Sequence, residues 1–183
     1  MQSVDSGEPD LLYFAHGMES GPWGTKISAL AGIARERGFR VCSPDYSHTR
    51  DPDARVRQLL DEHPATGGHL VLVGSSMGAY VSAVASGSLR PDGLFLMAPA
   101  MYLPGYEADP MVQAGRMAVV HGWRDAVVPV ANAIRFAQIH RAALHVLDGG
   151  HGLTQCLPAI RRIFANFLDE VLGAAEEQPD HPA

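Results

Sequence analysis

A doubly wound α/β fold, with a mostly parallel sheet of about six strands, is the architecture that this sequence predicts. Short stretches that are apolar throughout alternate along the chain with longer amphipathic stretches. Strands without polar alternation are typical of parallel sheets that helices cover on both faces. The chain has 183 residues, of which 46% are hydrophobic and 19% charged, so it is long enough to bury the core of one such domain.

The first half of the chain begins with a strand at 11–16, the apolar run LLYFAH. A helix is expected over 25–38, where apolar residues recur at helical spacing and a basic turn and a glycine follow. The run FRVCSP at 39–44 predicts a second strand that proline stops. A second helix is expected over 51–63, because an aspartate cap and a proline open it. The run HLVLVG at 69–74 predicts a third, fully buried strand.

The second half continues the alternation with a helix of small residues from 77 to about 86. Strands are expected at 93–99, 116–122 and 143–149, each an apolar run. Helices fit over 129–140 and 157–173, and the second of these places large apolar residues on one face. We therefore expect a single domain over 10–173, a flexible N-terminus over 1–9 and a disordered polar tail over 174–183.

Charge and composition exclude several classes of protein. The net charge of −6 disfavours binding to nucleic acid or to an anionic membrane, which requires clustered Lys and Arg. The two cysteines are too few for a disulfide framework, which favours a reducing compartment. The N-terminus lacks the pattern of a signal peptide, and no apolar run approaches the ~20 residues of a membrane span. A cytoplasmic protein is the expectation, and the sequence indicates no oligomeric state.

Two serines follow the third expected strand, in the segment Gly74-Ser75-Ser76-Met77-Gly78. A sharp turn that presents a nucleophile between a strand and a helix needs small residues two positions away on either side. Ser76 has glycine at both positions, whereas Ser75 has valine and methionine. The pattern predicts Ser76 as a nucleophile, although a glycine-rich turn that lets the helix pack closely on the sheet would use the same residues.

An acid and a histidine follow later strands in the order that α/β-hydrolases use, serine then acid then histidine. Asp125 lies just beyond the fifth expected strand, and His151 lies among glycines beyond the sixth. An aspartate there can hold the tautomer of a histidine and stabilise its imidazolium. The alternative role for Asp125 is to cap the helix that begins near Pro129. Asp148 is a rival acid, and Asp92 and Asp109 are weaker ones.

Acyl transfer also needs donors that point at the developing oxyanion. We expect these to be the backbone N–H groups of Met77, at the start of a helix, and of Met18, where Gly17 allows a close approach of the chain. His16 is expected to tie this loop together. No set of four ligands suits zinc, because no further pair completes His140 and His145, so neither metal nor cofactor is expected.

Four segments, 13–26, 74–80, 121–129 and 148–152, together resemble compact, lidless α/β-hydrolases, and the YqiA-like serine esterases in particular. The first segment is similar to the pattern H-G-x-x-S-x-P-x-x-x-K of that branch. It is matched here by His16, Gly17, Ser20, Pro22 and Lys26. The likeness covers most of residues 11–172. It implies a serine esterase acting on small acyl or aryl esters, with Ser76, Asp125 and His151 as its triad.

The interval after the fourth strand is too short for the helical cap of larger relatives, so we expect a minimal fold with an open site. Met101, Tyr102 and Leu103 in this interval could wall an acyl pocket, or they could belong to a surface loop whose apolar residues turn inward. The predicted function is cleavage of small, soluble carboxylic esters through an acyl-enzyme on Ser76. Two alternatives stay open: a thioesterase or acyl transferase with the same triad, and a non-catalytic binding protein that retains the fold.

Overall fold

The computed structural model describes residues 9–104, 106 and 109–173. Residues 1–8 and 174–183, which make up most of the expected flexible N-terminus and the whole expected tail, lie outside these ranges. Six strands form one sheet in the order β2-β1-β3-β4-β5-β6, and every neighbouring pair is parallel. The strands are β1 (Leu11–Ala15), β2 (Arg40–Cys42), β3 (Leu70–Ser75), β4 (Gly93–Met97), β5 (Arg116–Gly122) and β6 (Ala143–Leu147).

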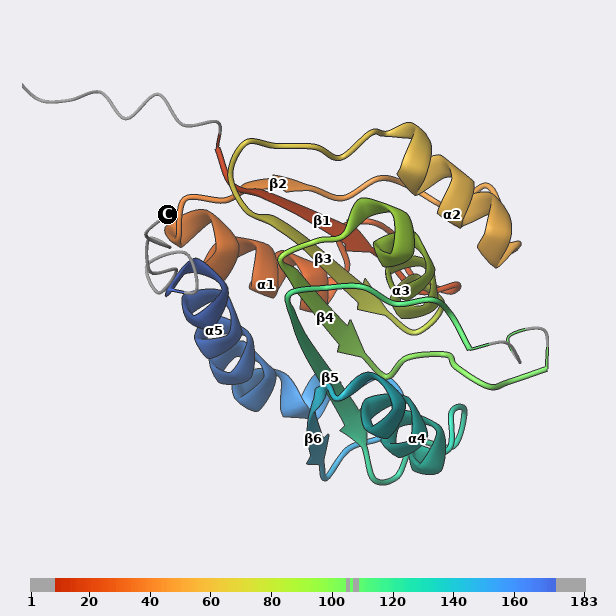
Figure 1. Cartoon of the computed structure of the whole chain (residues 1–183). Helices are drawn as coiled ribbons and strands as arrows, with labels where there is room; N and C mark the ends of the chain where they lie inside the picture. Colours follow the sequence, from red (N-terminus) through yellow and green to blue (C-terminus); the bar gives the residue numbers. More distant parts are fainter. Residues whose placement is uncertain (1–8, 105, 107–108, 174–183) are drawn as a thin grey trace, which may run out of the picture.

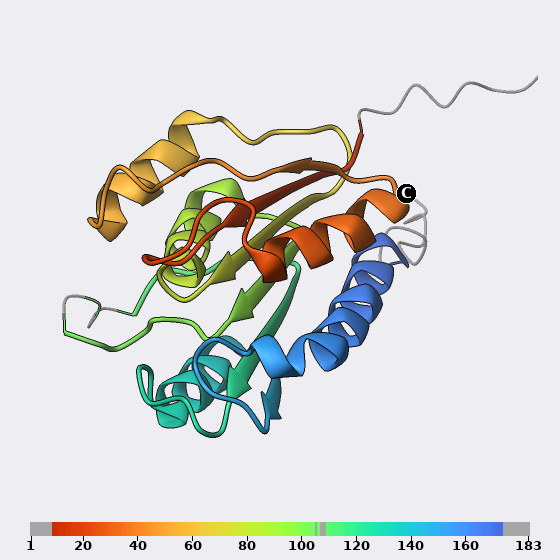
Figure 2. The same cartoon turned by 180° about the vertical axis from the view of Figure 1, so that it is seen from behind.

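Helices cover both faces of the sheet, which confirms the doubly wound architecture. The helices α2 (Pro52–Asp61), α3 (Met77–Leu89) and α4 (Val130–His140) lie on one face, turned toward the viewer in Figure 1. The helices α1 (Thr25–Glu36) and α5 (Leu157–Gly173) lie side by side on the opposite face, which Figure 2 shows. A short 3₁₀ turn, η1 (Thr154–Cys156), leads into α5 and was not among the expected elements.

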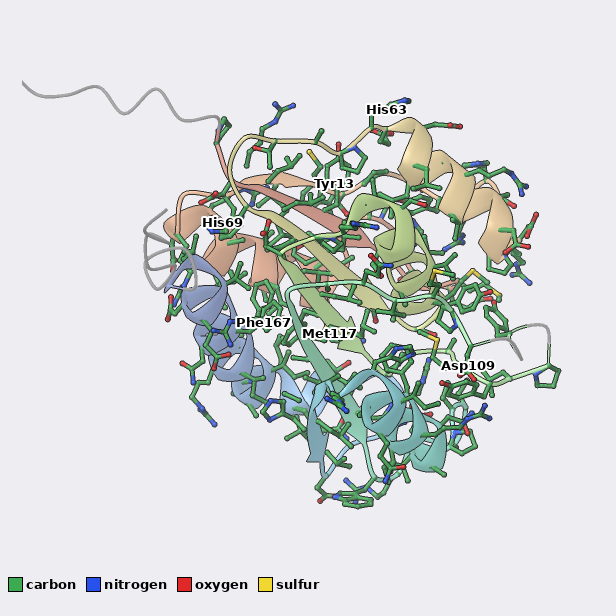
Figure 3. All side chains as sticks on the ribbon, viewed as in Figure 1. Tyr13, His63, His69, Asp109, Met117 and Phe167 are labelled. Carbon is green, nitrogen blue, oxygen red and sulfur yellow. The ribbon has the colours of Figure 1, made fainter. Side chains whose placement is uncertain are left out.

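Alternate residues of each central strand enter different halves of the core, because side chains alternate across a sheet. Leu12 and Phe14 of β1 pack with α1 and α5, whereas Leu11 and Tyr13 pack with α2 and α3. Phe167, labelled in Figure 3, reaches from α5 to the sheet, where its ring centre lies 5.3 Å from that of Phe95. Apolar strands are therefore required here, because both faces of each central strand are buried.

The segment between β4 and β5 carries no helix or strand in its described residues, 98–104, 106 and 109–115. The described residues of this segment therefore form no cap domain, as the short interval predicted. Since all six strands run in the same direction, the loops after β1, β3, β5 and β6 meet at one edge of the sheet. None of the helices in the described ranges combines the length and the apolar character needed to cross a membrane.

Candidate active site

Ser76 occupies a strained turn between β3 and α3. Its backbone has φ 55° and ψ −118°, a region that residues with a Cβ atom rarely adopt. The flanking glycines allow this turn because a Cβ at Gly74 would lie 2.4 Å from Ala79 Cα, and one at Gly78 would lie 1.9 Å from the Ala15 carbonyl oxygen. The close packing of α3 on the sheet therefore requires glycine at both positions that flank Ser76, the positions on which the choice of Ser76 over Ser75 depended.

His151 joins Ser76 to Asp125 through two hydrogen bonds. Its Nδ1 lies 2.8 Å from Asp125 Oδ2, and its Nε2 lies 2.9 Å from Ser76 Oγ. An ionised carboxylate can only accept, so the neutral ring carries its proton on Nδ1 and accepts the Ser76 hydroxyl proton at Nε2. The side chain of His151 is one-quarter exposed. The arrangement leaves Nε2 ready to take a proton from Ser76 Oγ.

Three hydrogen bonds hold the carboxylate of Asp125, whose side chain is fully buried. Its Oδ1 accepts the backbone N–H groups of Val127 and Val128, both at 2.8 Å, so the carboxylate also shapes the turn. Its Oδ2 accepts from His151 and also lies 3.4 Å from His121 Nε2. One carboxylate thus shapes its own turn and bonds His151, because its two oxygens serve different donors. Asp125 does not cap α4, since the N-cap of that helix is Pro129 and has no side-chain hydrogen bond.

His121, the last but one residue of β5, is fully buried behind Asp125. Its Nε2 donates to the Val128 carbonyl oxygen at 3.0 Å, and its Nδ1 has no hydrogen-bond partner. Burial lowers the pKa of His121 below its ordinary value, although the Val128 carbonyl and Asp125 oppose this. Burial thus favours the neutral form of His121, whose Nε2 N–H serves the Val128 carbonyl.

The rival acids each have other partners. The side chain of Asp148 is 79% exposed and lies 3.1 Å from Arg124. Asp92 Oδ2 accepts the Leu70 N–H at 2.8 Å. Asp109, labelled in Figure 3 near α4, lies 3.2 Å from Arg135. None of the three shares a hydrogen bond with His151 within the described residues.

The two backbone amides predicted as oxyanion donors belong to residues beside Ser76 and Gly17 in the chain. Met77 is the first residue of α3, and Met18 follows Gly17 in the loop after β1. In the described part of the chain, neither N–H has a hydrogen-bond partner. Gly17 lies close to Ser76, since a Cβ built on it would be 3.5 Å from Ser76 Cβ. Met18 lines the cavity at Ser76 and Met77 does not, so the role of the two amides as oxyanion donors stays a prediction.

A cavity of about 420 Å³ opens at Ser76 and His151. Its lining includes Gly17 and Gly152 together with Met18 and Val127, which are 37% and 59% exposed. Its charged lining residues are Glu19 and Lys26. The site suits a small ligand with an apolar part, because it offers few polar groups apart from Ser76, His151 and these two side chains.

The segment after β4, which was expected to offer pocket residues, does not line the cavity at Ser76 with those residues. Met101 is fully buried in the core, and Tyr102 packs against Arg135, whose guanidinium carbon is 3.9 Å from the ring centre. Neither of these residues nor Leu103 lines the cavity at Ser76. Met101 and Tyr102 pack in or against the core, which agrees with the alternative interpretation for these two residues. Met111 of the same segment is 77% exposed, so its apolar residues do not all turn inward.

Lys26 is a member of the site that the residue pattern alone did not single out; it entered only through the family resemblance. From the first turn of α1, its Nζ donates to the Gly152 carbonyl oxygen at 2.8 Å, next to His151. Burial lowers the pKa of Lys26, and the negative charge of Asp125 opposes the shift. The lysine thus ties the loop of His151 to α1. Within the described ranges, no cluster of three acidic, His or Cys side chains has the arrangement of a metal site.

Comparisons with known proteins place this geometry in a family. No family profile and no curated protein matches the chain, but solved structures do. A protein from Xanthomonas campestris pv. campestris, described as a hydrolase of the alpha/beta superfamily, is 32% identical over 88% of this chain and 98% of its own, with a TM-score of 0.78.

Two further structures share the fold at lower identity. Est1E from Butyrivibrio proteoclasticus is 16% identical, covers 94% of this chain and 92% of its own, and has a TM-score of 0.78. XC6422 from Xanthomonas campestris, described as a serine hydrolase without lid, is 21% identical over 99% of this chain and 88% of its own, with a TM-score of 0.65. On the identity to the first protein over nearly its whole length, the chain belongs to the alpha/beta hydrolase superfamily.

Proposed function

We propose that this protein is a serine hydrolase that cleaves small carboxylic esters through an acyl-enzyme on Ser76. The hydrogen-bond chain from Asp125 through His151 to Ser76 Oγ carries the proposal. Its serine lies at the mouth of a cavity, and its acid is buried away from solvent. A merely structural histidine would not need both a carboxylate on one nitrogen and a strained serine on the other.

In the first step, Ser76 Oγ attacks the ester carbonyl carbon while its proton passes to His151 Nε2. The carbonyl electron pair moves onto the oxygen, and the N–H groups of Met18 and Met77 stabilise the resulting oxyanion. Asp125 stabilises the imidazolium through the hydrogen bond to Nδ1. Collapse of the intermediate breaks the bond to the alcohol, which leaves with the proton from His151.

In the second step, water hydrolyses the acyl-enzyme. His151 Nε2 takes a proton from the water as its oxygen attacks the acyl carbon, and the same two amides stabilise the second oxyanion. The proton then returns to Ser76 Oγ as the acid leaves. The chain's own residues supply every group in this cycle, so the reaction as proposed uses neither metal nor cofactor.

The cavity favours short or aryl acyl groups. Its volume of about 420 Å³ lies near the lower end of small-ligand pockets, which span about 300–1,000 Å³. Without a cap, little apolar surface is available to cover a long lipid chain. Est1E, which has the same fold, has been observed with bound ferulic acid. Acetyl, butyryl and feruloyl esters are therefore suitable first substrates.

The decisive experiment is labelling with a fluorophosphonate probe, which reacts with an activated serine. Wild type should label, and Ser76→Ala should not. Ser75→Ala is the matched control, because it removes the neighbouring hydroxyl and leaves the Ser76–His151 bond in place. Hydrolysis of p-nitrophenyl acetate by Ser76→Ala should lose on the order of 10⁴ or more in kcat. Absence of labelling in a folded wild-type protein would exclude an activated serine.

The thioesterase alternative uses the same residues and is separated by substrate rather than by geometry. Matched oxyester and thioester pairs with identical acyl groups would decide it through their kcat/KM values. A higher kcat/KM for every thioester would assign the thioesterase reaction. Labelling of Ser76 together with hydrolysis of either class would exclude the non-catalytic alternative.

A further inference from the structure

Arg55 of α2 is a fully buried cation behind the loop that follows β1. It is 1% exposed, although its helix lies on the surface of the molecule. Its guanidinium lies 5.8 Å from the centre of the Tyr46 ring. A buried charge is costly unless hydrogen bonds or an opposite charge compensate it, so its position calls for a physical reason.

The hydrogen bonds of Arg55 all end on backbone carbonyls. Nε donates to the Thr49 oxygen at 2.9 Å, and one terminal nitrogen donates to the oxygens of His16 and Gly17 at 3.2 and 3.3 Å. The other terminal nitrogen is buried without a partner, and among the described residues no carboxylate forms an ion pair with this arginine. Burial accordingly lowers the pKa of Arg55, though an arginine stays charged.

His16 donates to one of the same carbonyls. The Tyr46 N–H donates to His16 Nε2 at 2.9 Å, so that nitrogen is unprotonated. The proton of the neutral ring is therefore on Nδ1, which donates to the Gly17 oxygen at 2.8 Å. Asp45, 3.6 Å from His16 Nε2, forms no ion pair with this neutral ring. The Gly17 carbonyl thus accepts from two buried side chains on one side of the loop.

The amide that follows the Gly17 carbonyl is the Met18 N–H. The structure has no cis peptide among the described residues, and in a trans peptide the C=O and the N–H point in opposite directions. When Arg55 and His16 hold the Gly17 oxygen, the Met18 N–H is turned away from them. Gly17 lies against Ser76, and Met18 lines the cavity with it.

We propose that Arg55 is a positioning residue that, with His16, fixes and polarises the Gly17–Met18 peptide as an oxyanion donor. The inference rests on the proposed function, because it needs an oxyanion beside Ser76. Hydrogen bonds to a carbonyl strengthen the N–H of the same peptide as a donor. The uncompensated positive charge adds to this effect, since it favours negative charge nearby in a low-dielectric interior.

The test compares Arg55→Met, Arg55→Lys and the control Arg57→Met. Arg57 is on the same helix but exposed, and its ion pair is a surface contact of 3.6 Å with Asp51. Loss of an entire oxyanion donor costs about 10²–10³ in kcat, so a misplaced donor should cost about 10- to 100-fold in Arg55→Met, with KM nearly unchanged. Arg55→Lys keeps the charge and should recover part of the loss, whereas Arg57→Met should match wild type.

A second measurement isolates the oxyanion. In an aryl trifluoromethyl ketone, Ser76 Oγ bonds to the carbonyl carbon, its proton passes to His151, and the carbonyl electron pair becomes an oxyanion. Affinity for the ketone should fall in Arg55→Met by the same factor as kcat/KM. Affinity for the corresponding alcohol, which cannot form the adduct, should stay unchanged. All rates are normalised to the fraction of protein that fluorophosphonate labels, so that misfolded protein is not counted.

The outcomes separate the two proposals. If wild type hydrolyses esters through Ser76 but Arg55→Met behaves like Arg57→Met, only the role of Arg55 is overturned. Equal losses for the ketone and the alcohol would likewise overturn it, because they would indicate lost packing in the cavity. If Arg55→Met does not fold, Arg55→Lys decides: a lower ketone affinity supports the role, and an unchanged one overturns it. A wild type that forms no adduct overturns the proposed function itself.

Discussion

Gly78→Ala tests how closely α3 must approach β1 to hold Ser76 in place. A Cβ at residue 78 would lie 1.9 Å from the Ala15 carbonyl oxygen and 2.7 Å from that of His16. Ordinary contact between these atoms requires the helix and the strand to separate by about 1.5 Å. Both partners are backbone, so no side chain can rotate away, and the cost should reach about 3 kcal/mol, the upper end for overpacked cores. That is a large part of a typical stability of about 5–15 kcal/mol.

Urea unfolding measures this cost, and Gly32→Ala is the matched control. Gly32 lies within α1, and a Cβ there would meet no atom within 4 Å. Its replacement should stabilise the protein by about 0.5–1 kcal/mol through helix propensity. In any Gly78→Ala protein that folds, a shift of ~1 Å between Ser76 and the loop of Gly17 should lower kcat about 10²-fold. Stability and kcat equal to those of Gly32→Ala would refute the reasoning.

Two further predictions concern Asp125 and its neighbours. Asp125→Asn presents an N–H to His151 Nδ1, which forces the proton of the ring onto Nε2. We expect kcat to fall about 10⁴-fold while the circular dichroism spectrum stays unchanged. A loss of kcat below tenfold would argue against the triad. The lowered pKa of His121 means that the unfolded chain binds the proton more readily, so the contribution of His121 to the free energy of unfolding should be fully present above pH ~6.5 and be lost as the pH drops below it. His121→Gln should reduce the dependence of the unfolding free energy on pH, measured by urea titrations between pH 7 and pH 5. Part of this dependence should remain in the variant, because burial also lowers the pKa of His140. An identical pH dependence in the variant and in wild type would contradict the assignment.

The fold could be predicted closely because parallel strands buried on both faces need apolar residues throughout. Each of the six strand runs overlaps an observed strand, and the largest departure is β2, which is reduced to Arg40–Cys42. β2 is at the edge of the sheet, where one side has no neighbour to extend the pairing. The order of strands did not follow from the residues. The short turn η1 was missed, because three residues are too few for a periodic pattern.

The site could be predicted in part for the same reason. Ser76, Asp125 and His151 follow strands, and a parallel sheet brings such positions to one edge; their hydrogen bonds are present, while their catalytic role stays a prediction. Sequence could not exclude Asp148, since only its exposure and its contact with Arg124 separate it from the buried acid. It could not find Arg55 either, because an arginine in an amphipathic helix is usually solvated and its burial depends on the loop packed against it.

The strain at Ser76 is maintained by hydrogen bonds rather than by the side chain. A positive φ at a serine costs about 1–3 kcal/mol, and such strain persists only where surrounding contacts fix it. The Ser76 N–H donates to the Met97 oxygen at 2.9 Å, and the Ser76 oxygen accepts from Ala79, Tyr80 and Ala100 at 3.0 to 3.3 Å. Relaxing the turn would break bonds to both β4 and α3, at about 1 kcal/mol each. The described residues form no cap, so in the proposed reaction the strands and helices that carry Ser76 and its amide donors hold them in place before the substrate binds.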